Sequence, residues 1–492
     1  MQQNTRAQQF FVRMLRGIRN DLFNVVLPEL SSGDAKEHTQ FSFMALDLYS
    51  AELELGAELA RTFASEFAAL INDIDTMLGS ATAPADAGDG LEQLRVRLAS
   101  TITRLGEHAD KGVEASRASA QLQRRIVAIE SRLRETISAT QQANAWKPAA
   151  VREKASPGMS VDNLSACLRR HFPGLPQDPV TKMTVLPGGR SKKTVFVSLK
   201  PNDVLPTEVV IRQDIPGNAV DTTEGTTTVV RESPALRAVE GKGLPVARAL
   251  LLEAENSECG APFMIVERLP GSAPGSYFGF HTPQDPATQE AVRDFARVLA
   301  RLHSIDPAML GLPDPHKSPE ARLRREVDYR WNKWRADAHL PSPILECALA
   351  RVRAECRPGV GETALVHGDT LQHNILVENG KVTALLDWEF VHIGDPAQDL
   401  AYCRHAVAQV IPWDEFVSIY VAAGGKPVSE KRLAIYGLVG LIRNCSFTAT
   451  CTRMFVNGES DDITMGASGY APLAFMEPQI AAALAQLDKI TQ

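Results

Sequence analysis

The hydrophobic pattern of this 492-residue chain changes near residues 145–160, and this change limits the folds that the chain can adopt. Up to about residue 143, apolar residues recur at spacings of three and four, which is the period of a helix. From residue 181, short β-branched and apolar runs lie between turn residues, a pattern typical of strands. The intervening segment has two prolines, a glycine and mixed charge, as interdomain linkers do. We therefore predict a helical bundle domain over residues 1–143 and a linker over residues 144–160.

The N-terminal helical segment carries few side chains suited to chemistry. It has no cysteine and only two histidines. We expect residues 1–150 to serve in packing or as a homo-oligomer interface, and the sequence does not distinguish between these roles.

Composition narrows the partners and the compartment. A formal net charge of −7 gives no general attraction for nucleic-acid phosphate or for anionic lipid, so we expect neither nucleic acid nor membrane as a partner. The seven cysteines are scattered and include no CxxC pair, which favours reduced thiols in a cytoplasmic protein over a disulfide framework. The sequence has no secretory signal after Met1 and no run of 18 uncharged apolar residues.

Beyond the linker, the pattern predicts an α+β arrangement. The runs TKMTVLPGG, KTVFVSL, TEVVIRQ and PFMIVERL occupy residues 181–269, with the helix-like ESPALRAVEGKG among them. We predict a small antiparallel sheet with a helix packed on it. An amphipathic helix follows over Pro286–Ile305, and the sequence from Asp395 onward is again mostly helical.

The most informative stretch, LVHGDTLQHNILVENGKVTALLDWEFVHIGDPAQDLAY, runs from Leu365 to Tyr402. Within it, Asn379-Gly380 is the favoured pair of a two-residue type I′ hairpin turn. This turn predicts that Asn374 lies opposite Leu385, and that Asp387 therefore lies close to Asn374. An amide and a carboxylate are expected to meet at one end of the hairpin.

These oxygen ligands predict a metal ion. Mg²⁺ takes few hard oxygen ligands from a protein and the rest from water and phosphate, and Asn374 and Asp387 meet that requirement. Asp369, on the loop before Asn374, remains available to face a hydroxyl group and take its proton in a phosphoryl transfer. His367 is expected to fix the same loop by hydrogen bonds.

The order of these residues resembles a known catalytic pattern. H-x-D-x-x-x-x-N followed by an Asp at a strand end resembles the catalytic loop and the metal-binding Asp of protein-kinase-like folds. HGDTLQHN followed by LLDWEFVHIGDPAQDLA is similar, more specifically, to the aminoglycoside phosphotransferase/choline kinase family of small-molecule kinases, over roughly residues 161–480. The resemblance implies a two-lobed protein-kinase-like fold, with a nucleotide-binding N-lobe over residues 161–270 and a catalytic, acceptor-binding C-lobe over residues 271–492. It also implies ATP and Mg²⁺ as cofactors, whereas the N-terminal helices are not part of the family's usual plan.

The resemblance also implies a set of nucleotide-binding residues. LPGGRSKKTVFV is similar to the loop that covers the nucleotide, where Gly188 and Gly189 would let the backbone approach phosphates and where Ser191 and Thr194 would add hydroxyl contacts. Arg212 stands on the third strand where protein kinases have a lysine, and it keeps the charge needed for a phosphate contact.

Further residues follow from the same resemblance. Glu232 is the expected ion-pair partner of Arg212, with Glu208 and Glu224 as competitors. Residues 267–269, from Glu267 to Leu269, match the hinge whose backbone would hold adenine, and Gly271 permits the turn into the larger lobe.

Several neighbouring polar residues have simpler interpretations. Asp395-Pro396 is typical of a helix start. Asp399 is expected to brace the catalytic loop, and His303 to be a hydrogen-bonded histidine on a packed helix. The sequence leaves Glu389 open, either as a carboxylate behind the metal ligands or as a neighbour of the metal.

The sequence favours an ATP- and Mg²⁺-dependent phosphotransferase with a hydroxyl-bearing small molecule as acceptor. An acidic loop over residues 456–466 suits an amino sugar, whereas arginines beside Trp331 and Trp334 suit an anionic acceptor such as a hydroxyacyl-CoA. A protein kinase is disfavoured because DWE replaces DFG and no APE segment follows. The alternative is a non-catalytic nucleotide-binding scaffold that uses the N-terminal helices to bind a partner.

Overall fold

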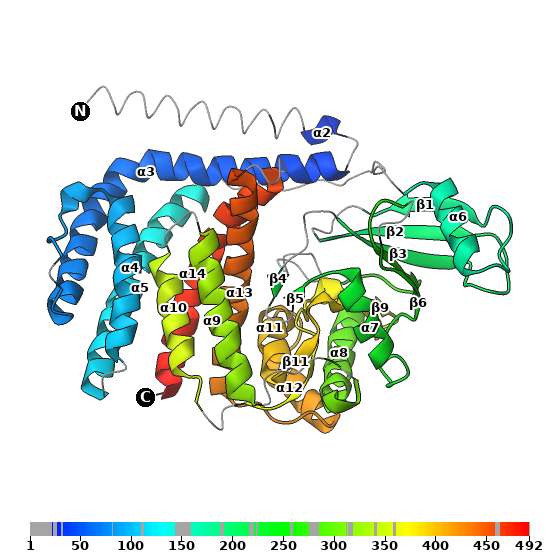
Figure 1. Ribbon diagram of the computed structural model, residues 1–492. Coiled ribbons are helices and arrows are strands. Elements are labelled where there is room, and N and C mark those ends of the chain that lie inside the picture. The colour runs from blue at the N-terminus through cyan, green and yellow to red at the C-terminus, as the bar shows by residue number, and fades with distance from the viewer. Residues whose placement is uncertain are drawn as a thin grey trace. The chain divides into compact units, whose positions relative to one another are not determined.

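The structure is a computed structural model of the chain (Figure 1). It describes these residues: 22, 27–30, 33–80, 82–109, 113–142, 159–186, 191–215, 221–222, 225–255, 259–274, 285–310, 312, 318–338, 342–357, 361–457 and 463–491.

Contacts divide the chain into two compact units. The first, which we call the helical unit, comprises residues 1–151, 324–357 and 438–492; the second, the two-lobed unit, comprises residues 152–323 and 358–437. The predicted domain boundaries at residues 143, 160 and 270 remain predictions. The compact units nevertheless cut across them, because two C-terminal segments pack with the N-terminal helices.

The smaller lobe of the two-lobed unit is built on an antiparallel five-stranded sheet in the order β1-β2-β3-β7-β6. Its strands are β1 (Val180–Val185), β2 (Lys192–Leu199), β3 (Glu208–Asp214), β6 (Ala249–Glu253) and β7 (Phe263–Glu267). A separate short pair is formed by β4 (Asp221–Thr222) and β5 (Gly225–Thr226). The sequence predicted four of the sheet strands and missed β6, at the sheet edge.

Successive side chains along each strand point to opposite faces of the sheet, and the two faces are covered by different helices. On β2, the buried Val195 and Val197 join a core cluster with Leu164 and Leu168 of α6 (Val161–His171). The helix α7 (Val229–Val239) packs against β3, β6 and β7 instead. Its buried residues belong to a second cluster that continues into the larger lobe.

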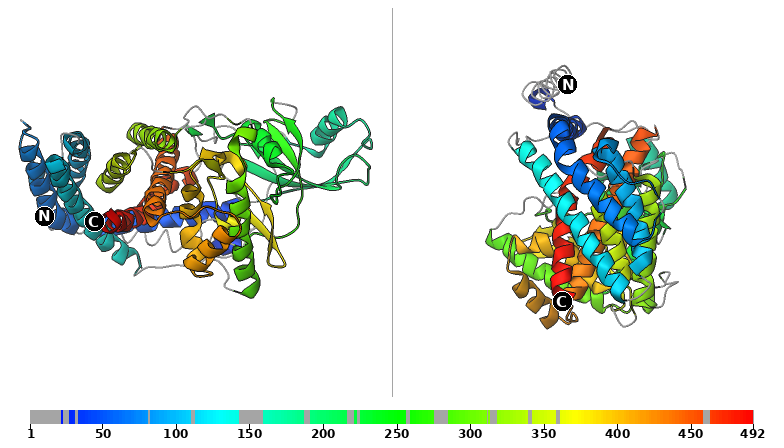
Figure 2. Two further views of the ribbon diagram at one scale, coloured as in Figure 1. Left: turned by 90° about the horizontal axis from the view of Figure 1, so that it is seen from below. Right: turned by 90° about the vertical axis from the view of Figure 1, so that its left-hand side faces the viewer.

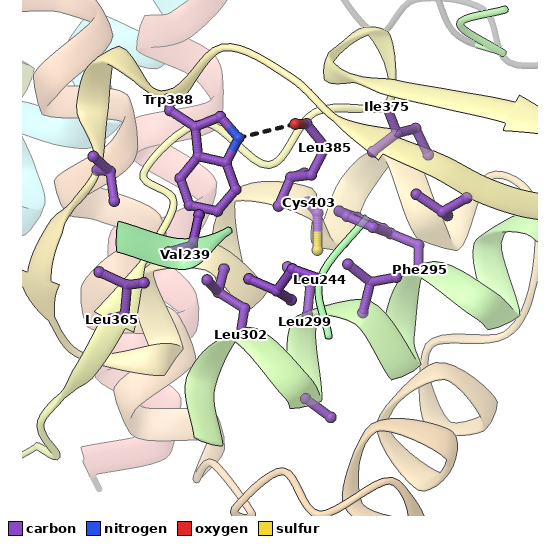
Figure 3. Packing of buried hydrophobic residues seen from close by; sticks show 14 of the residues in the cluster. Val239, Leu244, Phe295, Leu299, Leu302, Leu365, Ile375, Leu385, Trp388 and Cys403 are labelled. Atoms are coloured by element: carbon purple, nitrogen blue, oxygen red, sulfur yellow. Dashed lines mark hydrogen bonds between the residues drawn. The ribbon is translucent and has the colours of Figure 1, made fainter. Parts of the chain in front are cut away.

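The second cluster is the core of the larger lobe, and Figure 3 shows part of it. Trp388 is fully buried there, and its indole Nε1–H donates to the Leu385 carbonyl at 2.9 Å. The elements that surround this core are α8 (Pro286–Ser304), η3 (Pro307–Leu310), β8 (Ala364–Val366), η4 (Gln372–Asn374), β9 (Ile375–Glu378), β10 (Lys381–Leu385), η5 (Trp388–Phe390), β11 (His392–Gly394), α11 (Pro396–Ala408) and α12 (Trp413–Ala422).

The helical unit joins both ends of the chain. Its described elements are α2 (Leu27–Glu29), α3 (Gly33–Met77), η2 (Ala87–Asp89), α4 (Leu91–Ala109), α5 (Val113–Gln142), α10 (Pro343–Ala354), α14 (Ile463–Thr491), and the parts of α9 (Pro319–Asp337) and α13 (Glu430–Val456) that follow residues 323 and 437. Figures 1 and 2 show α3, α4 and α5 beside α10 and α14: α3 and α5 contact α14, and α4 and α5 contact α10.

Buried ion pairs connect these helices. Glu477 of α14 is fully buried, and its carboxylate accepts from the Arg134 guanidinium of α5 and from the Ser342 hydroxyl, the latter at 2.7 Å. Glu130 of α5 accepts from Arg95 of α4 through both carboxylate oxygens, at 2.9 and 2.8 Å. The described parts of α3, α4 and α5 therefore pack with helices of the same chain, which supports the predicted role in packing.

Among the described residues, no helix combines the length and the apolar character needed to cross a lipid bilayer.

Candidate active site

The hairpin predicted from Asn379-Gly380 is present. Both residues have positive φ, 49° and 72°, as a type I′ turn requires, and the turn joins β9 to β10. The predicted register is wrong by one residue beyond Val382, because Leu385 lies opposite Ile375 rather than Asn374. The shift occurs between Val382 and Ala384, where a β-bulge places one extra residue in β10.

The bulge changes how the two predicted metal ligands approach each other. The Asn374 carbonyl accepts from the Leu386 amide at 2.8 Å, so Asn374 is joined through its backbone to the residue that precedes Asp387. Asp387 itself has a left-handed backbone with φ of 64°, which few non-glycine residues adopt. Such strain at a polar residue is typical of functional sites.

The loop before the hairpin holds Asp369 by hydrogen bonds. The Asn374 amide Nδ2 donates to the Asp369 carboxylate at 2.8 Å and to the Asp369 carbonyl at 3.0 Å. The Asp369 amide in turn donates to Nδ1 of His367 at 3.2 Å. His367 is buried, with its ring edge-on to Trp388 at 5.0 Å, so it is placed to support the loop.

Asp399 braces the loop, as predicted. Its carboxylate accepts the backbone amides of His367 and Gly368, each at 2.8 Å, and Nε2 of His303 lies 3.1 Å away. Nδ1 of His303 lies 2.9 Å from the Tyr420 hydroxyl, so this histidine is hydrogen-bonded on both sides, as expected. Burial alone would raise the pKa of Asp399, but the contacts with His303 and with the His367 amide outweigh it and hold this pKa below the usual range.

Arg212 connects the sheet to the end of the hairpin. Its guanidinium donates to the Asp387 carboxylate at 2.6 Å and lies 3.6 Å from Glu232 of α7. Glu232 also accepts the backbone amide of Trp388 at 3.2 Å, which fixes the segment that follows Asp387. Of the competing acids, Glu208 pairs with Arg268 at 2.8 Å, and Glu224 lies outside the described residues.

These charges shift the pKa of Asp387. Burial raises it, but the positive charges of Arg212 and Lys192 outweigh burial and lower it below the usual range. The carboxylate is therefore ionised, as a metal ligand must be.

Lys192 is a second buried cation that the sequence analysis did not single out. Its side chain is 2% exposed, its ammonium pairs with Glu389, and Glu232 lies 3.7 Å away. The Ser191 hydroxyl also donates to Glu389, at 2.9 Å. Burial and the charge of Asp387 raise the pKa of Glu389 to about 7, against the opposing effect of Lys192. In this structure Glu389 contacts a lysine and a serine.

A sequence signal for Lys192 exists. Lys192 pairs with Asp214 and Thr194 pairs with Arg212 across β2 and β3, so Lys192, Thr194 and Arg212 share one face of the sheet. Counting back two residues from Thr194 would have found the lysine.

The other predicted nucleotide-binding residues have mixed outcomes. Gly188 and Gly189 lie outside the described residues. Glu267 ends β7, and its side chain accepts from Arg248 at 2.9 Å, while Leu269 packs against the core of the larger lobe.

Gly271 stands where the chain enters the larger lobe. Its φ is 107°, and a Cβ there would lie 2.7 Å from the Val377 carbonyl oxygen, so the position requires glycine as expected.

The predicted acceptor features receive no support. Trp331 and Trp334 are 7% and 4% exposed, and Trp331 lies against the guanidinium groups of Arg335 and Arg353, so both indoles serve packing in the helical unit. Residues 458–462 of the acidic loop lie outside the described residues.

The donor set fits a magnesium-bound polyphosphate. The Asp387 carboxylate and the Asn374 side-chain oxygen are hard ligands of the kind Mg²⁺ prefers, and the Asn374 amide nitrogen is already engaged by Asp369. Two cations, Arg212 and Lys192, stand beside Asp387. Within the described residues, the buried Arg212 Nε makes no hydrogen bond and lies 3.6 Å from the Glu232 carboxylate.

Comparisons with known proteins identify the family of the chain. The model of the family described as "Phosphotransferase enzyme family" matches residues 182–436, slightly more than half of the chain. Acyl-CoA dehydrogenase family member 11 of Rattus norvegicus is 27% identical over 284 residues, covering 56% of this chain and 35% of the relative. The Gallus gallus protein of that name is 29% identical over 245 residues, covering 49% of this chain and 30% of the relative. The chain thus spans about a third of the length of these curated relatives.

The solved structures show the fold. A candidate aminoglycoside phosphotransferase from Ralstonia eutropha superposes with a TM-score of 0.50 at 20% identity, covering 66% of this chain and 98% of that one. The predicted two-lobed protein-kinase-like fold, with helices added at the N-terminus, is confirmed.

Proposed function

The chain belongs to the phosphotransferase enzyme family, and we propose that it transfers the γ-phosphoryl group of ATP to a hydroxyl group of a small molecule, with Mg²⁺ as cofactor. One observation carries the proposal. Asp369, held by Asn374, and Asp387, held by Arg212, stand at the same end of one short hairpin.

Each residue has a defined part in this reaction. Asp369 orients the acceptor hydroxyl and accepts its proton, while Asn374 keeps the Asp369 carboxylate in place. His367 positions this loop and does not itself contact the substrate. Asn374 and Asp387 would hold Mg²⁺, which when bound neutralises charge on the phosphates.

The cations serve the nucleotide. Arg212 and Lys192 both lie near Glu232, at 3.6 and 3.7 Å, and so stand close together. Both offer positive charge to phosphate oxygens. We further propose that the loop residues Gly188, Gly189, Ser191 and Thr194 cover the phosphates and that the backbone of residues 267–269 holds the adenine ring.

The family and the relatives suggest which acceptor classes to test. Two classes are tested first, amino sugars and hydroxyacyl-CoA thioesters, the second because the curated relatives carry acyl-CoA in their name. The burial of Trp331 and Trp334 removes the sequence argument for the acyl-CoA class, so the choice between the two classes rests on assay.

The substitution Asp369→Asn tests the assignment. The amide keeps the size of the carboxylate but accepts no proton, so we expect kcat to fall about 10²–10⁴-fold. Product is detected by mass spectrometry across a panel of hydroxylated metabolites, and binding of ATP with Mg²⁺ is measured by calorimetry and is expected to stay near the wild-type value.

The matched control is Asp414→Asn, because Asp414 is an exposed acid in the first turn of α12. An Asp369→Asn variant as fast as the control would disprove the role of Asp369.

A specific contact favours a second function. Arg212 donates a hydrogen bond to the Asp387 carboxylate at 2.6 Å, and this ion pair competes with a metal ion for the same carboxylate. A non-catalytic nucleotide-binding scaffold, with the N-terminal helices as a partner or homo-oligomer surface, would bind ATP without turnover on every acceptor in the panel. Reduced thiols suit a cytoplasmic location for either function.

A further inference from the structure

Four side chains of types that can bind metals gather in the smaller lobe, on the α6 side of the sheet. Cys167 and His171 lie one turn apart on α6, Glu253 ends the edge strand β6, and Cys259 precedes β7. We call these four residues the thiol cluster. Both cysteines are buried in the core beneath α6, and His171 and Glu253 form the outer side.

The donor atoms are close enough to share one ion. Nε2 of His171 lies 2.9 Å from Oε2 of Glu253, and Sγ of Cys167 lies 3.6 Å from the same oxygen. The ligand atoms of these three residues all lie within 4.8 Å of one another. The Cys259 thiol is hydrogen-bonded to the Cys167 thiol, and this contact, burial and the nearby Glu253 raise the pKa of Cys167.

This spacing suits tetrahedral coordination. Ligands at the usual zinc distances of about 2.0–2.3 Å stand about 3.3–3.8 Å from one another. For Cys167, His171 and Glu253 the observed separations need small side-chain adjustments and no movement of the helix or the strand. The Cys259 thiol, which contacts the Cys167 thiol, would have to turn towards the same ion.

The surroundings of Glu253 indicate a site for positive charge. The Arg170 guanidinium lies 2.9 Å from Oε2 of Glu253 and 3.6 Å from Sγ of Cys167. Together with His171 and Cys167, it makes three side chains that converge on this carboxylate oxygen. The side chain of Arg170 is half exposed, at 51%, and can turn away towards solvent. Arg170 thus holds the place that a dication would take.

From this geometry we propose that Cys167, His171, Glu253 and Cys259 bind one Zn²⁺ or a similar thiolate-binding divalent ion. The thiols release their protons to solvent as they become ligands, and no other bond changes. Two thiolates, one imidazole and one carboxylate fill a closed tetrahedral shell, which is the pattern of a structural rather than a catalytic site.

The ion would join α6 to the edge of the sheet. Within the described parts of the smaller lobe, α6 and β6 contribute to one core without being neighbours in the chain. A metal bound to both holds them together and adds its binding free energy to the stability of the folded state. The cations proposed to contact phosphate, Lys192 and Arg212, belong to the α7 side, so this proposal is independent of the proposed function.

Metal titration of the full chain tests the site. Reduced protein freed of metal by chelation is titrated with Zn²⁺ against a chromophoric chelator, and separately with Co²⁺, whose thiolate charge-transfer band reports sulfur ligands. We expect one ion per chain and a higher melting temperature with Zn²⁺.

Single substitutions identify the ligands. Cys167→Ser and Cys259→Ser should each remove about half of the charge-transfer intensity and weaken Zn²⁺ binding by at least about tenfold. The control is Cys356→Ser, because Sγ of Cys356 donates to the Val352 carbonyl at 3.4 Å and a hydroxyl can replace that bond. The control should retain stoichiometry and affinity.

Arg170→Ala provides a second test that a misfolded variant cannot imitate. Removing the competing guanidinium should tighten Zn²⁺ binding, because Glu253 no longer has to release an arginine. Absence of stoichiometric binding, wild-type affinity in both cysteine variants, or weaker binding in Arg170→Ala would overturn the proposal. A Cys167–Cys259 disulfide that forms equally fast with and without Zn²⁺ would also overturn it.

Discussion

The two compact units both bury carboxylates beside cations, but they surround these pairs differently. In the helical unit, Glu130 receives two hydrogen bonds from Arg95, and Glu477 receives one from Arg134 and one from Ser342. The oxygens of these two carboxylates are accounted for by named donors. Such pairs fix how helices meet, because a shifted helix would leave a buried charge unpaired.

In the two-lobed unit, the corresponding cluster is incompletely satisfied. Arg212 Nε, Glu232 Oε2 and His367 Nε2 are buried and make no hydrogen bond with any residue that the structure describes. Cations and acids there alternate around Asp387 and Glu389 rather than forming isolated pairs. For these carboxylates, complete pairing accompanies a structural role, whereas the cluster around Asp387 leaves buried polar atoms to which a ligand can bind.

The largest expected effect on stability comes from Glu477→Gln. The amide keeps the shape but leaves the buried Arg134 guanidinium without this counter-charge, which costs about 3–5 kcal/mol of unfolding free energy. Urea unfolding measures the loss, and ATP affinity is expected to be unchanged. The double variant Arg134→Met, Glu477→Met should recover much of the loss, because no buried charge remains. A loss below about 1 kcal/mol in the single variant would break the comparison.

Substitution of Arg212 is expected to affect activity more than stability. Arg212→Met removes a cation from the proposed phosphate site, so kcat/KM should fall about 10²–10³-fold. The melting temperature should change less than in Glu477→Gln, because Lys192 still faces Glu232 and its charge still acts on Asp387. Arg212→Lys keeps the charge without the planar fork and should restore most of the activity. A Met variant that unfolds readily but retains kcat/KM would reassign Arg212 to structure.

Local sequence patterns predicted several features of the candidate active site. The type I′ turn, the loop from His367 to Asn374 and the helix start at Asp395 depend on residues close together in the chain, so their patterns are readable. The pairing of Arg212 with Glu232 followed from a resemblance that fixes both positions.

Ion pairs between residues far apart in the chain could not be predicted from the sequence. Lys192 meets Glu389 across a separation of 197 residues, and Arg134 meets Glu477 across 343, and no local period encodes either contact. The bulge in β10 was missed for a related reason. Thr383 donates its hydroxyl to the Pro270 carbonyl at 2.5 Å, a contact outside the hairpin itself.

The smallest expected effect concerns Asp75 on α3, whose carboxylate receives several hydrogen bonds but whose arginine partners are partly exposed. Thr82 donates to its carboxylate at 2.8 Å and Arg97 at 3.0 Å, and Arg104 also donates. Burial raises the pKa of Asp75, but these hydrogen bonds outweigh it and lower the pKa below 3.8. Because the folded pKa is lowered, the contribution to stability is complete above pH 3.8 and is lost as pH falls through the folded value.

We therefore expect Asp75→Asn to cost about 1 kcal/mol at pH 7, a figure reduced for the exposure of both arginines, and less at pH 3. Urea unfolding at both pH values measures the difference. Asp73→Asn is the matched control on the same helix, because the pair of Asp73 with Arg125 is about half exposed on both sides and should contribute less than about 0.5 kcal/mol at either pH. If the two variants lose stability equally, completeness of pairing does not determine what a charged pair contributes, and the contrast between the two units would need another cause.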